Sequence, residues 1–289
     1  MSFSKDVKDE LFEVIPKSRH CAIAELVGIV VASRKATNNS LEEVFAQIQQ
    51  DVNINRKVFT LLKKTLNIKG DVLAFDDLDF GEIKKMLRID DKFNTVDRLV
   101  IQQSCCKRAF IRGTFLVSGS ISDPNKGYHF EIVCGNDLQA TQIMDCINAF
   151  EIDAKIVRRT GKYVVYIKEG AGIVEMLRVM EASHSVMELE NIRVVKEVRG
   201  TINRKVNCET ANISKTVNAA VRQIEDIHLI DEKLGLDNLP EALQEIAQVR
   251  LDYPDTPLGD LGQHLDPPIG KSGVNHRLKK LAAIADTLR

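Results

Sequence analysis

The sequence has 289 residues, enough for about two domains, and 44% of them are hydrophobic, as in an ordinary folded protein with a core. Its 40 Lys and Arg and 41 Asp and Glu leave a net charge of −1, so a DNA-binding surface would have to come from local clustering of charge. No apolar run approaches the ~20 residues that a membrane span needs, and the N-terminus lacks the apolar core of a signal peptide. We therefore expect a cytoplasmic protein with no membrane partner.

The first 90 residues predict several helices and two short strands. Residues 19–32 predict a helix that is apolar nearly all round and therefore buried, in which Ala24 and Gly28 would let another helix approach closely. The other elements predicted here are an amphipathic helix over 3–14, a strand in which Val44, Ala46 and Ile48 alternate, a helix over 54–66 with a glycine stop signal at 67–70, a strand over 72–75 and a helix over 80–87.

A similar order of elements recurs after residue 100. Helix, strands, helix, strands and helix occur twice, in residues 19–87 and 100–180, which we interpret as a tandem structural duplication with an α+β fold. The elements predicted in the second copy are a helix over 100–117, a turn over 123–127, a strand over 128–134, a helix over 138–150, a hairpin of 154–158 with 163–167 and a helix over 172–180.

A basic segment follows. Between residues 193 and 222 there are seven basic and two acidic residues, a local charge of +5, and the apolar spacing over 211–230 predicts a helix. Two interpretations remain open: a solvated basic linker helix, or an arm that follows DNA phosphates. The candidate phosphate contacts are Arg199, Arg204, Lys205 and Lys215.

Three helices are predicted in the C-terminal segment. A helix over 239–250 precedes a short one that begins at Thr256, as N-cap, and Pro257, and that ends at the prolines of 266–268. The last helix starts near Lys271. Its apolar residues recur at helical spacing and predict one buried stripe: Val274, Leu278, Leu281, Ala285 and Leu288.

The other side of the last helix is polar and basic. Between residues 271 and 280 there are four Lys or Arg and no acidic residue. A helix that packs by an apolar stripe and presents such side chains to solvent can enter the major groove of DNA, where Lys holds phosphates and Ser, Asn and Arg read base edges. The alternative is a three-helix bundle with a solvated basic face. The candidate DNA contacts are Lys271, Ser272, Asn275, His276, Arg277, Lys279 and Lys280.

The cysteines and histidines give no sign of catalysis or of a metal site. The six cysteines form no CxxC, no histidine lies at ligand spacing from a second cysteine, and Cys105 and Cys106 would point apart on a helix. We expect reduced, mostly buried thiols. The histidines are scattered, and no phosphate-binding loop motif is present. The sequence therefore predicts no catalytic residue, no metal and no cofactor.

The residues described above resemble the WhiA family of bacterial regulators along essentially the whole chain. The stretch IGKSGVNHRLKKLAAIAD is the most specific, and LGDLGQHLDPP, LPEALQEIAQVRLDYPD, NRKVNCETANISKTVNAAVRQI and SFSKDVKDEL support it. The resemblance implies a degenerate homing-endonuclease-like domain of two LAGLIDADG-type αββαββα repeats over 1–190, a basic linker over 191–228 and a helix-turn-helix domain over 229–289, similar to the promoter-reading domain of sigma factors.

The same resemblance implies a role. Family members are linked to sporulation in actinobacteria, and to cell division and chromosome segregation in Firmicutes. We therefore expect a nucleoid-associated transcription regulator whose partner is double-stranded promoter DNA. RNA polymerase or another regulator is a candidate partner of the N-terminal domain, and a structural adaptor with secondary DNA contact is an alternative.

Resemblance to the nucleases also predicts that this chain is not an enzyme. In those nucleases each motif helix ends in an acidic residue that binds a divalent metal. Counted along the motif, the acid falls at Ser33 and Ser118 here, and a neutral hydroxyl is a poor ligand for Mg²⁺. A metal site relocated to Asp123 and Glu131, in a metal-dependent nuclease, is the rival interpretation.

Overall fold

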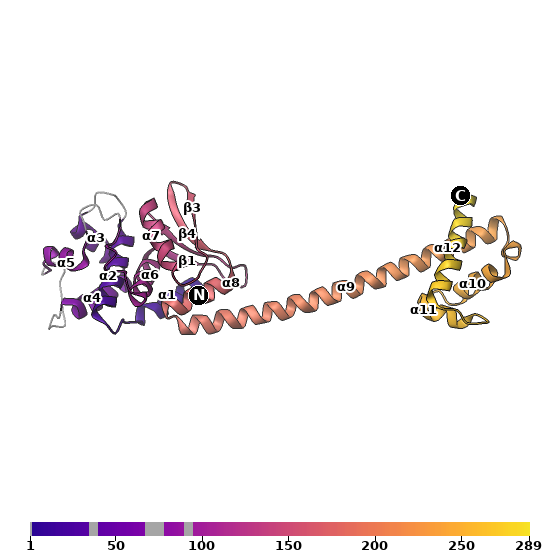
Figure 1. Ribbon diagram of the computed structural model, residues 1–289, viewed down its shortest axis with the longest axis horizontal. Coiled ribbons are helices and arrows are strands. Elements are labelled where there is room, and N and C mark those ends of the chain that lie inside the picture. The colour runs from indigo at the N-terminus through magenta and orange to yellow at the C-terminus, as the bar shows by residue number, and fades with distance from the viewer. Residues whose placement is uncertain (1, 35–39, 67–77, 90–94) are drawn as a thin grey trace. The chain divides into compact units, whose positions relative to one another are not determined.

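The computed structural model describes residues 2–34, 40–66, 78–89 and 95–289. The chain divides into two compact units, residues 1–196 and 197–289 (Figure 1). The fold is α+β: helices and a small antiparallel sheet form the first unit, and helices form the second. None of the described helices is long and apolar enough to cross a membrane.

Two buried helices, α2 (Arg19–Ser33) and α6 (Ser104–Ser118), form the centre of the first unit. Their backbones touch at two glycines. A Cβ atom on Gly28 would lie 2.5 Å from the carbonyl oxygen of Phe110, and one on Gly113 would lie 2.3 Å from that of Glu25. Real Cβ atoms do not approach backbone so closely, so only glycine permits this packing. The close approach predicted from Gly28 is confirmed.

The remaining elements surround this pair. Figure 1 shows α3 (Leu41–Ile48), α4 (Val52–Leu66) and α5 (Phe80–Leu87) on the side of α2, and the sheet on the side of α6. The helix α1 (Phe3–Glu13) contacts both α4 and α6, and buries Phe3, Val7 and Leu11. One apolar core therefore extends from α1 through the central pair to both flanks.

The sheet has four antiparallel strands in the order β1-β2-β4-β3. One of its faces packs against α6 and α7 (Asp137–Asn148), and α8 (Gly170–Met180) follows the last strand. In β2 alternate residues are buried, as expected for a strand with one covered face. The strands are β1 (Gly119–Ile121), β2 (Phe130–Cys134), β3 (Lys155–Arg159) and β4 (Lys162–Ile167).

One predicted element is wrong. Residues 44–48, predicted as a strand, belong to the helix α3. Ser40 accepts a hydrogen bond from the Glu43 amide, and the Glu43 carboxylate accepts one from the Ser40 amide, which forms a capping box at the start of the helix. The buried residues Leu41, Val44, Phe45 and Ile48 have helical spacing that the alternation of three residues hid. The strand predicted over 72–75 and the stop signal at 67–70 lie outside the described residues.

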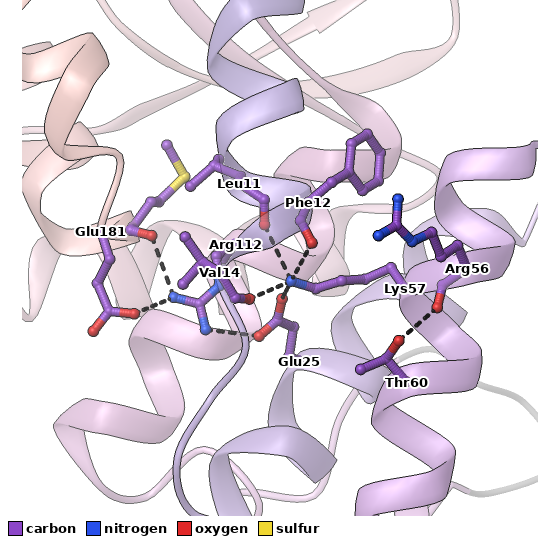
Figure 2. A network of polar contacts seen from close by, with 10 residues as sticks. Leu11, Phe12, Val14, Glu25, Arg56, Lys57, Thr60, Arg112 and Glu181 are labelled. Atoms are coloured by element: carbon purple, nitrogen blue, oxygen red, sulfur yellow. Dashed lines mark hydrogen bonds and ion pairs between the residues drawn. The ribbon is translucent and has the colours of Figure 1, made fainter. Parts of the chain in front are cut away.

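A largely buried network of charged side chains joins five helices of the first unit (Figure 2). Arg112 of α6 donates hydrogen bonds to Glu25 of α2 over 2.7 Å and to Glu181, the C-cap of α8, over 2.6 Å. Lys57 of α4 lies 3.1 Å from the other oxygen of Glu25. The Lys57 ammonium also donates to the carbonyls that end α1, those of Leu11, Phe12 and Val14. Burial lowers the pKa of Lys57, and the carboxylate of Glu25 opposes that shift.

The second unit is helical throughout. The helix α9 (Ser183–Lys233) begins in the first unit and ends in the second, where Ile227 and Ile230 join the core of α10 (Glu241–Asp252), α11 (Leu258–Leu261) and α12 (Lys271–Leu288). Short 3-10 turns at Leu236–Asn238 and Gly262–His264 connect these helices.

Candidate nucleic-acid interface

The last helix, α12, is anchored by one apolar stripe. Val274, Leu278, Leu281 and Ala285 are buried against the other helices of the second unit. These four are the residues predicted to be inside, and Leu288 is half-buried at the end of the helix. The stripe fixes how α12 is rotated about its own axis, so the opposite side of the helix faces solvent.

A tight loop places the start of α12 next to the preceding turn. The backbone amide of Ile269 donates to the carbonyl of Gly262 over 3.0 Å. A Cβ atom on Gly262 would lie 2.0 Å from the carbonyl oxygen of Ile269, so the loop can close only over a glycine. The segment that separates α11 from α12 is therefore held at both ends, and α12 begins at Lys271 as predicted.

The solvent-facing side of α12 is polar and basic, and its side chains lack partners within the described residues. Lys271, Lys279 and Lys280 are exposed, and so are three polar residues, Ser272, Asn275 and His276. Within the residues that the structure describes, none of these six side chains forms a hydrogen bond or ion pair. At 100° per residue, Ser272, Asn275, His276 and Lys279 fall on one face, opposite the buried stripe. We call these six exposed residues the α12 face, although Lys271, in the first turn, lies beside the buried stripe and not opposite it.

Arg277 stands apart from the α12 face. Its side chain is only 24% exposed, and it donates to the Glu245 carboxylate over 3.3 Å and to the Ala242 carbonyl over 3.2 Å, both on α10. An arginine that joins α12 to α10 in this way positions the helix. The structure thus brings together six of the seven residues predicted from the sequence and gives the seventh an internal partner.

A buried arginine shapes the turn between α10 and α11. Arg250, which is 1% exposed, donates to the carbonyl oxygens of Tyr253 (3.3 Å), Pro254 (3.2 Å) and Thr256 (2.9 Å). Among the described residues, no other side chain donates to these three carbonyls. The Arg250 guanidinium therefore holds the loop between α10 and α11 in place. The N-cap of α11 is Pro257 and not Thr256, so the helix start predicted at Thr256 is one residue early.

The four candidate phosphate contacts on α9 are all exposed, and one of them lines a groove together with the first residue of α12. Lys215 and Lys271 line the same groove, of about 580 Å³, between α9 and the loop that precedes α11. Arg199, Arg204 and Lys205 do not line it. With a rise of about 1.5 Å per residue, Lys205 lies roughly 15 Å before Lys215 along the helix axis.

Such an arrangement can hold a polyanion. Lys side chains and the unpaired amides at a helix N-terminus both attract phosphate, and the N-cap of α12, Gly270, supplies no side chain that would occupy those amides. Asn275 and Ser272 offer donors and acceptors that match base edges in the major groove. The α12 face therefore offers positive charge, helix-end amides and polar side chains that can bind a polyanion.

The two positions predicted to correspond to nuclease acids occupy equivalent places in the fold. Ser33 is the last residue of α2 and Ser118 the last residue of α6, and both are half-buried. The Ser118 hydroxyl donates to the carbonyl of Thr114 over 3.2 Å. A helix-end hydroxyl bonded to its own helix carries no negative charge for a divalent cation.

The acids of the rival metal site have separate partners. Glu131 accepts hydrogen bonds from Ser120 over 3.1 Å and from His129 over 3.0 Å, and it lies 3.9 Å from Arg159. Asp123 is exposed in a turn, where the backbone amide of Asn125, 2.9 Å away, lowers the pKa of its carboxyl group. Among the described residues, neither acid belongs to a group of three or more side chains that could hold a metal ion.

The predicted hairpin of 154–158 with 163–167 is confirmed, but sequence reasoning missed that its basic and aromatic side chains pair. The strands β3 and β4 carry basic side chains over aromatic rings: Arg158 lies 5.8 Å from the ring centre of Tyr163, and Lys168 lies 5.2 Å from that of Tyr166. The signal was present in the sequence, where residues 155–168 contain five basic and no acidic residues. The register of the two strands was needed to place Arg158 opposite Tyr163.

Sequence reasoning also missed a cluster of four side chains, those of His20, Cys21, Cys105 and Cys106. Cys105 and Cys106, expected to point apart, both bring their Sγ atoms to the same place. Four of the six cysteines are buried, as expected, whereas Cys105 and Cys208 are exposed. Burial, and then hydrogen bonding with Cys105, raises the pKa of the Cys21 thiol to about 12. The two pairs of residues lie 85 positions apart in the sequence, so no local spacing of ligands indicated the cluster.

Comparison with known proteins gives the lineage of both units. Residues 202–285 match the WhiA C-terminal HTH domain, and residues 107–199 match the WhiA LAGLIDADG-like domain. The chain is 47% identical to the probable cell division protein WhiA of Lachnoclostridium phytofermentans, over all of both chains. It is 42% identical to the protein of the same name from Clostridium novyi, over all of this chain and 99% of the other.

A solved structure extends the match to the fold. The crystal structure of full-length DUF199/WhiA from Thermatoga maritima aligns over 99% of each chain with a TM-score of 0.56 and 26% sequence identity. The order of the two domains, the fold of each and the full-length identity to curated relatives agree. The chain belongs to the WhiA family.

Proposed function

We propose that this protein is a sequence-specific regulator that binds duplex DNA through the α12 face. The observation that carries the proposal is a helix whose apolar stripe is buried in a helix-turn-helix domain, while its six polar and basic side chains are exposed and unpaired within the described chain. A helix presented in this way matches the width of the major groove. Family membership supports the assignment.

The residues divide into two kinds of contact. Lys271, Lys279 and Lys280 contact phosphates and supply most of the affinity, which makes binding dependent on salt. Ser272, Asn275 and His276 contact base edges and supply the sequence preference. Arg277 acts indirectly, because its bonds to α10 fix the orientation of α12.

The basic side of α9 extends the interface. Lys215 lines the same groove as Lys271, so one phosphate backbone could pass both side chains. Arg199, Arg204 and Lys205 precede Lys215 on the same helix and are exposed. We assign Lys215 to a phosphate contact beside the α12 face and the other three to weaker contacts with flanking DNA.

The names of two relatives support a proposal for the biological role. Two relatives that match this chain over its full length are named probable cell division proteins. We propose that this chain controls transcription of genes for cell division and chromosome segregation, and that it acts on promoters in the nucleoid. Selection of bound duplexes from a random library by the full chain tests sequence preference. A consensus sequence is the expected result, and recovery of unselected sequence would contradict it.

We propose that the LAGLIDADG-like domain does not cut DNA. Ser33 and Ser118 replace the acids at both helix ends, and Asp123 and Glu131 have separate partners. Incubation of the full chain with supercoiled plasmid and Mg²⁺ or Mn²⁺ tests this. Plasmid that stays supercoiled is the expected result. Cutting that Asp123→Asn abolishes would establish the nuclease instead.

A further inference from the structure

Four side chains of types that can bind metal meet at the first turns of α2 and α6. His20 Nε2 and the Sγ atoms of Cys21, Cys105 and Cys106 all lie within 4.8 Å of one another. His20 Nε2 is 3.5 Å from Cys105 Sγ. Cys21 and Cys106 are buried, whereas His20 and Cys105 are exposed. Within the described part of the chain, no other His, Cys, Asp and Glu side chains form such a group of three or more.

The packing of the two central helices creates this cluster. His20 and Cys21 are the second and third residues of α2, and Cys105 and Cys106 are the second and third residues of α6. The same offset of 85 residues relates Gly28 to Gly113, where the two backbones touch. Each helix therefore contributes two ligands, and these come from equivalent positions. The close contact of the two helices holds the four side chains in place.

We propose that His20, Cys21, Cys105 and Cys106 bind one Zn²⁺ ion. Three thiolates and one imidazole form a common tetrahedral zinc ligand set, with Zn–S distances of about 2.3 Å and Zn–N distances of about 2.0–2.1 Å. Neighbouring ligand atoms in such a site are about 3.5–3.8 Å apart. The distance from His20 to Cys105 already has this value, and the others need to shorten by about 1 Å or less.

The surroundings suit the charge of this site. Zn²⁺ with three thiolates and a neutral imidazole has a net charge of −1. The ligands lie in the first turns of two helices, where the helix dipoles favour negative charge. Arg108 lines the pocket that also borders Cys21 and Cys105, so this pocket wall carries a positive charge.

The zinc would fasten α2 to α6. Four protein ligands leave no open coordination position, which is typical of structural zinc sites. The site is also remote from the helix ends that bear metals in nucleases, since Ser33 lies 13 residues from His20 in α2, or roughly 20 Å along the axis. The metal site is independent of the proposed DNA binding and of nuclease chemistry.

Cobalt titration of the full chain tests the proposal. The protein is purified with a reductant, stripped of metal by a chelator and titrated with Co²⁺ without oxygen. We expect thiolate-to-Co²⁺ charge-transfer absorption and the visible bands of tetrahedral Co²⁺, both saturating at one ion per chain and displaced by Zn²⁺. Absence of these bands, or a disulfide between two of the three cysteines in the native chain, would overturn the proposal.

Two variants locate the ion without disturbing the core, because the substituted side chains are exposed. Cys105→Ser and His20→Asn should each weaken Co²⁺ binding more than about tenfold, since loss of an outer-shell partner alone weakens metal binding about 10- to 100-fold. Cys208→Ser is the matched control, an exposed cysteine of the other unit. Equal Co²⁺ affinity in Cys105→Ser and Cys208→Ser, with equal helix content by circular dichroism, would contradict the site.

Discussion

Arg112 donates a hydrogen bond to Glu25 over 2.7 Å, and both side chains are almost fully buried between α6 and α2. Replacing Arg112 by Leu leaves the Glu25 carboxylate buried with Lys57 as its remaining charged partner. We expect Arg112→Leu to reduce the free energy of unfolding by about 3–5 kcal/mol, because a buried charge loses its compensation. Urea unfolding followed by circular dichroism measures this, since the chain has no Trp for fluorescence.

The matched control is Arg178→Leu. Arg178 pairs with Glu175 and Glu190 at 3.2 and 3.3 Å, but its side chain is 53% exposed. An exposed ion pair contributes about 1 kcal/mol or less. Equal destabilisation by the two substitutions would show that burial of the Arg112–Glu25 pair is unimportant.

The glycine contact gives a steric prediction. Gly28→Ala and Gly113→Ala would each place a Cβ atom against backbone of the other helix, at 2.5 and 2.3 Å. We expect each to cost at least about 1–3 kcal/mol of unfolding free energy, as overpacking of a core does. Gly127→Ala, where an added Cβ meets nothing within 4 Å, is the control and should leave stability unchanged within error. A neutral Gly113→Ala would mean that the helices can separate freely.

Two buried thiols should make the free energy of unfolding decrease at alkaline pH. Burial raises the pKa of Cys134 and Cys146 from 9.0 to about 12. Between these values the unfolded chain has lost protons that the folded chain keeps, so their contribution is complete below pH 9 and is lost as the pH rises. We expect a slope of up to about 1.4 kcal/mol per pH unit for each thiol.

The comparison is between the wild type and the double substitution of Cys134 and Cys146 by Ala. Urea unfolding at about pH 8 and about pH 10 should show a smaller decrease for the variant, because it has lost both titrating groups. Other groups with shifted pKa values, such as Lys57, are common to both proteins and cancel in the difference. An identical decrease in both proteins would contradict the assignment of the raised pKa values to burial.

Arg250 gives a prediction on the helix-turn-helix domain. Its replacement by Leu leaves three carbonyls of the turn before α11 without their donor. A hydrogen bond to a charged group contributes about 1.5–3 kcal/mol, so we expect α10 and α11 to open locally when these three bonds are lost. Hydrogen-exchange mass spectrometry should show faster exchange in residues 241–261 and no change in the first unit. Gln248→Leu, an exposed change in the same helix, is the control.

The C-terminal helices could be predicted from the sequence because their signals are local. The stripe of Val274, Leu278, Leu281 and Ala285 has helical spacing, and prolines mark the neighbouring turns. The free polar face of α12 follows from that stripe by geometry alone. The internal partner of Arg277 could not be predicted, because Glu245 lies 32 residues away on another helix.

In the first unit, prediction was limited by tertiary contacts. The strand at Val44–Ile48 was wrong because three alternating residues outweighed the capping signal of Ser40 and Glu43. Gly28 indicated that α2 packs closely against another helix. The identity of that helix and the ionic network could not be predicted, because they depend on contacts between distant segments. The ligand cluster is the extreme case, since His20 and Cys105 are 85 residues apart.

The salt dependence of DNA binding tests the central claim most directly. A labelled duplex carrying the selected consensus is titrated with wild type, with Lys279→Ala/Lys280→Ala and with the control Lys5→Ala/Lys17→Ala, which removes two exposed charges from the first unit. We expect weaker binding by the α12 variant alone, and a salt slope shallower by about 1.8, since each lost phosphate contact removes about 0.9. Affinity and slope equal to the wild type would show that α12 does not contact DNA.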